Sequence, residues 1–277
     1  MSKLLVCIFS YNRPHHLELC LHYVLKAVSE DTEIIIFDDC SDNMDVNKFA
    51  NGQILVDICS FPNTQTSVRD CAARLASQRR RAVDRFLATD CDYLFFLDDD
   101  IIIGETSLVD MIDDLTFFEG VDYIEVGAVT LHGITRPNFL LKVGNIQYRS
   151  ITISGEANLM MSRRMLETTG NKFNPTHKDG FADLQLKAMR SRGFEYLCRT
   201  RPVNEVQHIG IGQKGSIIHR EQVVPPPWCQ EPYKTVYGRT LNVQGFDLTT
   251  YLNLVEEVGG ELAPKLYKQN FLEKDNE

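Results

Sequence analysis

The stretch LFFLDDDIII, residues 94–103, places three adjacent aspartates inside an otherwise apolar decapeptide. The apolar residues before the aspartates are typical of a buried β-strand. Three neighbouring negative charges are costly there, because like charges repel and burial disfavours each ionised carboxylate. The stretch therefore predicts a buried strand that ends at a charged edge of a sheet, and this edge is the first candidate for a functional site.

Similar strands precede this one along the chain. Three further apolar runs stop at polar or turn-forming residues, and they lie at residues 3–9, 32–37 and 52–61. With the run at 92–100 they give four strands, and apolar residues at helical spacing predict helices over 14–28 and 69–88. Continuous apolar strands that alternate with helices are typical of a parallel sheet covered on both faces, so the sequence predicts an α/β fold.

The second half of the chain is less regular. Strands are predicted over residues 123–131, 150–162 and 194–200. A short helix over 163–170 and a longer one over 181–193 each end at a glycine, and another helix is predicted over 247–258, after the proline-rich turn at 224–228. No repeat or low-complexity linker interrupts the sequence, so we expect a single domain over residues 1–277.

Composition limits the partners of this protein. The formal net charge of −9 argues against extended contacts to a nucleic-acid backbone. A local basic groove stays open, because six arginines fall within one predicted helix: Arg69, Arg74, Arg79, Arg80, Arg81 and Arg85. No apolar run reaches the roughly 18 residues that a membrane span needs, so none is expected. The eight cysteines show no paired spacing, which indicates reduced thiols and a cytoplasmic location.

Polar groups follow three of the first four predicted strands. They are Ser10-Tyr11-Asn12, Asp38-Asp39 and Asp98-Asp99-Asp100. In an open parallel sheet, ligands bind beyond the carboxyl ends of the strands, so these groups are expected at one edge. Crowded carboxylates raise each other's pKa unless a cation offsets them, and Mg²⁺ commonly joins one or two carboxylates to a substrate's phosphates. The sequence therefore predicts a divalent cation shared with a diphosphate; the alternative is a polar loop that only caps a strand.

Three segments carry a resemblance to a known family. CIFSYNRP (7–14), EIIIFDDCSDN (33–43) and DYLFFLDDDI (92–101) resemble, in order and spacing, the nucleotide-sugar-binding half of family 2 glycosyltransferases with the GT-A fold. GEANLMMSRRMLETTG (155–170) is similar to the family's glycine-rich strand and following helix. GFADLQLKAMRSRGFEY (180–196) is similar to its Glu-Asp helix and the strand after it. The resemblance covers residues 3 to roughly 215.

The resemblance implies a fold and a division of the chain. The GT-A fold is a Rossmann-like, mostly parallel central sheet with helices on both faces. Residues 1–103 would form the nucleotide-sugar-binding half, 104–223 the acceptor and catalytic half, and 224–277 a C-terminal extension. The activity implied is transfer of a sugar from a nucleotide-diphosphate sugar, expected to be UDP-linked, to a hydroxyl acceptor.

The resemblance also implies roles for the residues at the strand ends. Ser10 and Asp39 would hold the nucleotide base, Asp39 by accepting from a uracil N–H, with Tyr11, Asn12 and Asp99 beside the donor. Asp98 would lie near the ribose or the metal, and Asp100 would ligate Mn²⁺ or Mg²⁺ directly. These assignments leave the acidic strand end responsible for both the nucleotide and the cation.

Two further assignments complete the donor side. An arginine in the helix before the fourth strand contacts the donor in the family; the segment QRRRAV offers Arg79, Arg80 and Arg81, with Arg79 taken as the candidate. His208 resembles a histidine that completes the metal site in many GT-A enzymes. The alternatives are a solvated basic helix face for the arginines and a core position for the histidine.

The acceptor side requires a general base. The family places it at the aspartate of a Glu-Asp pair, which here reads Ala182-Asp183, so Asp183 is the expected base and Asp179 the fallback. The missing glutamate and a helix about one residue short of the family pattern leave this alignment open, and Asp183 as a simple first-turn helix residue is the alternative. Glu156 is expected to line the sugar pocket, because a charge inside an apolar strand needs a partner.

Four functions remain open on the sequence. They are an inverting glycosyltransferase, a retaining one that needs no such base, a nucleotidyltransferase, and a non-catalytic nucleotide-binding protein. The SYNRPHH segment lacks the glycines of a nucleotidyltransferase phosphate loop, and intact Asp39, Asp98 and Asp100 argue against a non-catalytic protein. The acceptor is not identified by the sequence: a glycan or other polysaccharide, a lipid, a protein, a small molecule or a modified nucleobase are all compatible.

Overall fold

The computed structural model describes residues 2–42, 45–59, 68–119, 124–131, 137–143, 146–151, 158–173, 183–200 and 206–208. The first half alternates strands and helices as expected. Its elements are β1 (Leu4–Ser10), α1 (Pro14–Ala27), β2 (Glu33–Asp38), the 3₁₀-helix η1 (Val46–Phe49), β3 (Ile54–Ile58), α2 (Val68–Leu87) and β4 (Tyr93–Asp98).

The second half contains more strands than the sequence indicated. Its elements are β5 (Ile101–Ile103), α3 (Ser107–Glu119), β6 (Glu125–Thr130), β7 (Pro137–Val143), β8 (Ile146–Ile151), β9 (Asn158–Ser162), α4 (Arg163–Thr169), α5 (Asp183–Ser191), β10 (Phe194–Thr200) and β11 (Val206–His208). The predicted strand over 150–162 is wrong as a single element. Its described parts belong to β8 and β9, which lie apart in the sheet.

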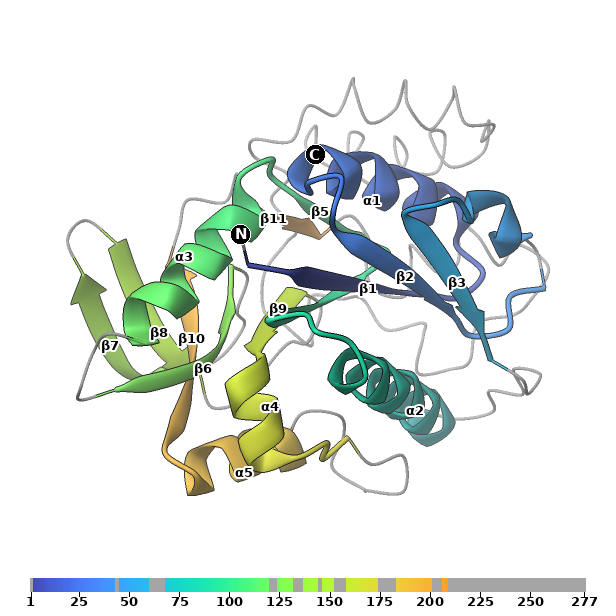
Figure 1. Cartoon of the computed structure of the whole chain (residues 1–277). Helices are drawn as coiled ribbons and strands as arrows, with labels where there is room; N and C mark the ends of the chain where they lie inside the picture. The colour runs from blue at the N-terminus through green and yellow to red at the C-terminus, as the bar shows by residue number, and fades with distance from the viewer. Residues whose placement is uncertain are drawn as a thin grey trace, which may run out of the picture.

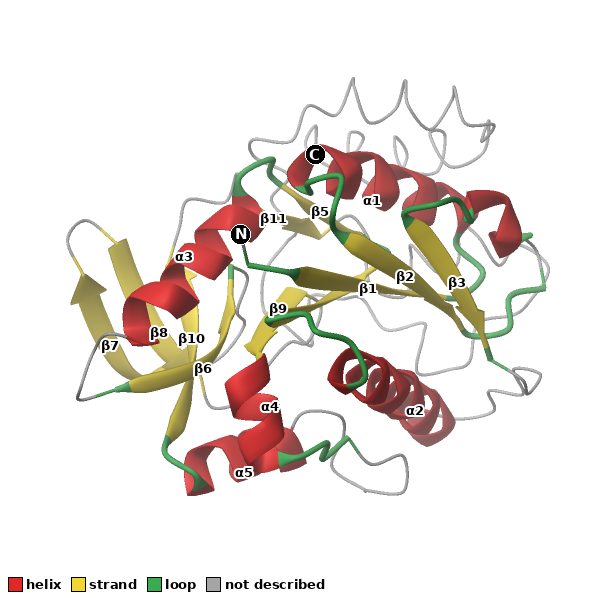
Figure 2. Ribbon diagram, viewed as in Figure 1, coloured by secondary structure: helices red, strands yellow, loops and turns green. Residues whose placement is uncertain are grey.

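Most described strands form one nine-stranded sheet in the order β3-β2-β1-β4-β9-β6-β10-β8-β7. Strands β3, β2, β1 and β4 pair in parallel, and β9 runs antiparallel to both β4 and β6. Only β9 and β8 oppose the common direction within this sheet, so it is mostly parallel (Figure 2). A separate pair, β11 and β5, is antiparallel.

Helices cover both faces of the sheet, which confirms the predicted α/β architecture. Side chains of α1 and α3 pack with Val6, Ile8 and Leu97 on one face. Side chains of α2, α4 and α5 pack with Cys7 and Phe96 on the other. Figure 1 shows α1 and α2 on opposite sides of β1–β3. Alternate residues of each central strand therefore face different helices, as the period of two of a β-strand requires.

A buried polar cluster ties α3 to the second half of the sheet. Asp114 Oδ1 accepts hydrogen bonds from Arg199 Nη2 and from the Tyr148 hydroxyl, each at 2.5 Å. All three side chains are buried. Burial raises the pKa of Asp114, and the contacts to Arg199 and Tyr148 oppose that shift. The cluster joins α3, β8 and β10 through one carboxylate.

Three predicted features lie outside the described residues: the helix over 247–258, the proline-rich turn at 224–228 and the Glu156 strand segment. The two glycine stops have the backbone that favours glycine, with φ of +68° at Gly170 and +88° at Gly193. Among the described helices, none combines the length and the apolar character that crossing a membrane requires.

Candidate active site

The polar groups predicted at one edge do lie side by side. Ser10 is the register partner of Asp38 in β2, and Phe9 is the partner of Asp98 in β4. The chain continues this alignment past the strands, because Asp39 N donates to Ser10 O at 2.9 Å and Asp99 N donates to Phe9 O at 3.1 Å. The carboxyl ends of β1, β2 and β4 therefore lie side by side, and the residues Asp38, Asp39, Asp98, Asp99 and Asp100 at these ends are hereafter called the acidic edge.

The loop after β1 is fastened to the loop after β2. Asn12 adopts a φ of +52°, which asparagine tolerates better than most residues. Its backbone N donates to Ser41 Oγ at 2.8 Å, and its side-chain Oδ1 accepts from Asp42 N at 2.8 Å. Ser41 in turn donates to both carboxylate oxygens of Asp38, from N at 2.8 Å and from Oγ at 2.5 Å. Asn12 thus shapes the loop that leads into α1, while Tyr11 is partly buried beside it.

The pleat of β4 directs the first two aspartates of the triple to opposite sides. Asp98 follows Phe96 onto the α2 side, where Arg79 Nη2 donates to its Oδ1 at 3.0 Å. Asp99 follows Leu97 toward the α1 side, where it accepts from Ser10 Oγ at 2.8 Å. The repulsion between these two neighbours is reduced because their charges have different partners on different faces.

Arg13 bridges the second and third aspartates. Its Nη2 lies 3.1 Å from Asp99 Oδ1, and its Nη1 lies 2.5 Å from Asp100 Oδ2. Asp99 is fully buried, whereas Asp100 keeps 6% of its surface exposed. Burial raises the pKa of Asp99 to about 7, with Arg13 opposing the shift and Asp100 adding to it. Arg13 lies in the quoted SYNRP segment, but sequence reasoning gave it no role.

A second arginine that was not singled out holds Asp39. Arg74 Nε donates to both oxygens of Asp39 at 2.9 Å, and Arg74 Nη2 lies 2.7 Å from Oδ1. The same Nη2 also contacts Cys59 Sγ at 3.7 Å. The helix containing Arg74 was identified as arginine-rich, but its face toward Asp39 depends on how α2 docks on the sheet, which residue spacing alone does not give.

The structure separates the three arginines of QRRRAV. Arg79 is buried against Asp98, with its guanidinium carbon 5.0 Å from the Phe9 ring centre. Arg81 pairs with Asp57 of β3, and Arg80 is exposed. Only Arg79 therefore contacts the acidic edge, and it does so from inside the protein.

The remaining predicted residues are placed only in part. Asp183 is the first residue of α5, and its side chain lies outside what the structure describes, as do Asp179 and Glu156. The backbone of His208 is described: it is the register partner of Ile101, the residue directly after Asp100. The backbone of β11 therefore runs beside β5, and the metal-site role of His208 stays a prediction.

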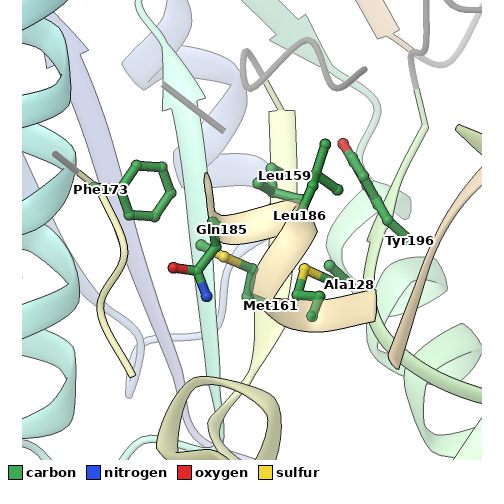
Figure 3. Close-up of a pocket in the computed structure, with 8 residues that line it drawn as sticks. Ala128, Leu159, Met161, Phe173, Gln185, Leu186 and Tyr196 are labelled. Carbon is green, nitrogen blue, oxygen red and sulfur yellow. The ribbon is translucent and has the colours of Figure 1, made fainter. Parts of the chain in front are cut away.

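A small pocket near α5 does not belong to this edge. It is lined mainly by apolar side chains of β6, β9, β10 and α5, among them Leu159, Met161 and Leu186 (Figure 3). Its Gln185 side chain is engaged, since Nε2 donates to Thr169 Oγ1 at 2.8 Å. The pocket is part of the packed core under α5.

Comparison with known proteins identifies the family of this chain. The sequence profile of glycosyl transferase family 2 matches residues 5–168, more than half of the chain. The chain belongs to glycosyl transferase family 2. The family resemblance expected from the sequence is thus confirmed, and the mostly parallel sheet with helices on both faces is the GT-A fold.

Solved structures similar to this family 2 protein share little sequence with it. Residues 1–349 of TarS from S. aureus, in complex with UDP, match with a TM-score of 0.48 and 14% identity, over 70% of this chain and 57% of that one. The mannosyltransferase PcManGT from Pyrobaculum calidifontis, in complex with GDP-Man and Mn²⁺, matches with a TM-score of 0.48 and 12% identity, over 97% and 79%. This chain therefore spans little more than half of the TarS structure. A sequence search of curated proteins gives no match.

The acidic edge of this family 2 protein offers carboxylate oxygens but no enclosed metal site among the described side chains. Within the described residues, no group of three or more acidic, histidine or cysteine side chains is arranged to hold a metal. Asp98 and Asp100 do offer carboxylate oxygens, which hard cations prefer. Arg13, Arg74 and Arg79 each pair with a carboxylate of this edge.

Proposed function

We propose that this protein transfers a sugar from a UDP-linked donor to an acceptor hydroxyl, with Mn²⁺ or Mg²⁺ bound and with inversion at the anomeric carbon. The observation that carries the proposal is that Asp39 follows β2 and that Asp98 and Asp100 lie at the end of β4, the two strands on either side of β1, in a family 2 protein. The division into a donor half (1–103), an acceptor half (104–223) and an extension (224–277) is part of this proposal.

On the donor side, Asp39 accepts the uracil N–H in this proposal. Arg74 supports that role, because contacts to both carboxylate oxygens fix the plane of the Asp39 carboxylate before the nucleotide binds. Ser10, Tyr11 and Asn12 form the adjoining wall of the nucleotide site. Asp99 and Arg79, both almost fully buried, act behind this wall by holding their neighbours and do not touch the donor.

On the cation side, Asp100 is the direct ligand, Asp98 contacts the ribose or the cation, and His208 completes the set. A bound divalent cation would stabilise the negative charge of the leaving nucleoside diphosphate. The carboxylate oxygens of Asp98 and Asp100 support this assignment, because hard cations prefer oxygen ligands.

On the acceptor side, Asp183 is the general base, with Asp179 as the fallback and Glu156 in the sugar pocket. The acceptor oxygen forms a bond to the anomeric carbon as the bond to the diphosphate breaks, and Asp183 accepts the hydroxyl proton. The position of Asp183 at the start of a helix supports an ionised carboxylate, because the N-terminal end of a helix favours negative charge.

The arginines of α2 do not favour a nucleic-acid acceptor. Arg74, Arg79 and Arg81 are paired with Asp39, Asp98 and Asp57, and Arg85 Nη2 lies 3.8 Å from Glu33. We therefore favour a glycan, a protein or a small molecule as the acceptor over a modified nucleobase. A cytoplasmic location stays a prediction, which cell fractionation tests.

The experiment is a calorimetric titration with a panel of UDP-, GDP- and dTDP-sugars, with Mn²⁺ or with EDTA, followed by an assay of slow donor hydrolysis. We expect one UDP-sugar to bind only with the cation. Asp100→Asn should abolish this cation-dependent binding. Asp90→Asn is the matched control, because Asp90 lies just before the opposite end of β4, largely exposed and paired with Lys3.

The same material tests the chemistry. Asp183→Asn should keep donor binding and lose transfer, and normal turnover in this variant would refute the assignment of the base. The anomeric configuration of the product separates inversion from retention. Release of pyrophosphate from a nucleoside triphosphate would instead identify a nucleotidyltransferase. Cation-independent donor binding would remove the cation from the proposal.

A further inference from the structure

Arg13 is held at the acidic edge by the backbone around it. It is the last residue before α1, whose first residue is Pro14. The preceding residue, Asn12, has a positive φ and is bonded to the loop after β2. The start of α1 and the fastened loop thus fix the Arg13 backbone on both sides, so its side chain projects from a defined point next to β4.

The two ionic contacts of Arg13 are not equivalent. Asp99 has no exposed surface and is also held by Ser10 Oγ. Asp100 lies at the edge, one residue before β5, and its side chain keeps 9% of its surface exposed. Arg13 itself keeps 20% of its side chain exposed. Asp99 is therefore a fixed anchor for the guanidinium, whereas Asp100 is accessible from the solvent side.

Arg13 differs in this respect from the other arginines at the edge. Arg79 pairs with Asp98, and its side chain is only 2% exposed. Arg74 is bound to Asp39 through both oxygens. Loss of either carboxylate would remove an ion-pair partner from a buried or partly buried guanidinium, which is costly. Arg13 would keep Asp99.

We propose that Arg13 is a positioning residue that neutralises Asp100 in the cation-free protein and yields this carboxylate to the divalent cation while it stays paired with Asp99. This inference rests on the proposed function, because it takes Asp100 as the cation ligand. Before the cation binds, Arg13 keeps two adjacent carboxylates from repelling each other. Once the cation binds, its charge replaces that of the guanidinium at Asp100, and no charge is left without a partner.

The exchange has a measurable consequence, because Arg13 and the cation compete for one carboxylate. Removal of the guanidinium should strengthen the binding of Mn²⁺ alone by about tenfold or more, since a unit charge a few ångströms away alters the energy of a divalent ion by at least that factor even in water-like screening. A purely structural role predicts the opposite, because a misplaced Asp100 would bind the cation less tightly.

The experiment measures Mn²⁺ binding to the full chain by calorimetry and by the electron paramagnetic resonance signal of free Mn²⁺, without nucleotide and with UDP. The variants are Arg13→Met, Arg13→Lys and Arg13→Gln, the last as a second neutral variant should the first not fold. Arg85→Met is the control, because it also removes one positive charge, but at an exposed position paired with Glu33. Thermal unfolding with and without Mn²⁺ gives a second readout.

We expect both neutral variants to bind Mn²⁺ about tenfold more tightly than the wild type, and Arg13→Lys and Arg85→Met to stay within about twofold. Without Mn²⁺, the melting temperature of both neutral variants should be lower than that of the wild type. Addition of Mn²⁺ should raise it by more than it raises the melting temperature of the wild type. Equal or weaker Mn²⁺ binding in the neutral variants overturns the inference and leaves the proposed function intact. A wild-type chain that binds no Mn²⁺ even with UDP overturns the cation dependence of the proposed function and the exchange with it.

Discussion

The assignment of Arg79 to an internal role leads to a quantitative prediction for Arg79→Met. In the structure, Arg79 Nη2 donates to Asp98 Oδ1 at 3.0 Å, and the guanidinium carbon lies 5.0 Å and 5.9 Å from the Phe9 and Phe96 ring centres. Methionine retains apolar volume but removes the charge and the hydrogen bond. We expect the free energy of unfolding to fall by about 2–4 kcal/mol.

The magnitude follows from how unequally the two partners are exposed. Loss of one partner from a fully buried ion pair costs about 3–5 kcal/mol, because the other charge stays buried and unpaired. Asp98 keeps 26% of its side chain exposed, so water screens part of this penalty and the lower end applies. Loss of the contacts to the two aromatic faces adds about 0.5–2 kcal/mol. Apolar packing of the methionine offsets part of the sum.

The assay is urea unfolding followed by circular dichroism, with UDP binding measured in parallel. Arg80→Met is the matched control: it removes the neighbouring, exposed arginine and should change stability by less than about 0.5 kcal/mol. Asp98→Asn and the double variant complete a cycle that isolates the coupling of Arg79 to Asp98. We expect a coupling energy of at least about 1 kcal/mol.

Two results would refute this reasoning. Loss of less than about 1 kcal/mol in Arg79→Met, with additive effects in the cycle, would show that Arg79 does not hold Asp98. Unchanged stability together with lost UDP affinity would instead make Arg79 a direct contact to the donor, as the family resemblance implied.

Two further substitutions test the packing of the second half. Gly127→Ala should lower the free energy of unfolding by about 1–3 kcal/mol, because the added Cβ would lie 2.4 Å from Met165 Cγ in the core. Gly52→Ala is the control, because no atom lies within 4 Å of the Cβ it would add. Equal urea midpoints of the two variants would contradict this packing. Tyr148→Phe should cost about 1.5–3 kcal/mol at pH 7 by removing the bond to Asp114. Burial, and after it the hydrogen bond to Asp114, raises the pKa of Tyr148 to about 12. The wild type should therefore lose the stability that Tyr148 contributes as the pH rises from about 10 to about 12, whereas Tyr148→Phe should not. Identical pH profiles of urea unfolding would contradict the assignment.

The first half of the fold could be predicted because local pattern and tertiary burial agree there. The strand β10 was also placed correctly, at residues 194–200. The prediction of one strand over 150–162 was wrong because an apolar run indicates burial but does not show where the chain passes from one strand of the sheet to another. Helix α3 was missed for a different reason: Asp114 occupies an inward position where an apolar residue is expected, and only Arg199 and Tyr148, far away in sequence, make that burial tolerable.

The candidate site could likewise be predicted only in part. Parallel register alone brings Ser10, Asp38 and Asp98 together, so their meeting could be predicted from the strand ends. The counter-ions could not, because Arg13 and Arg74 reach the edge from a loop and from a helix whose rotation on the sheet decides which side chains point inward. The sequence still shows an unexplained run of acidic residues at 98–100, although it does not show which arginines pair with them.

The order in which the three aspartates meet their partners explains why the run is stable. The pleat sends Asp98 toward α2 and Asp99 toward α1, so the first two carboxylates do not share a counter-ion. Asp100 comes after the strand has ended and shares Arg13 with Asp99. Separating the buried Asp99 from Arg13 would leave a carboxylate inside the protein without its guanidinium. Asp100 is therefore the aspartate of the triple that can lose its arginine contact while that arginine keeps a carboxylate partner.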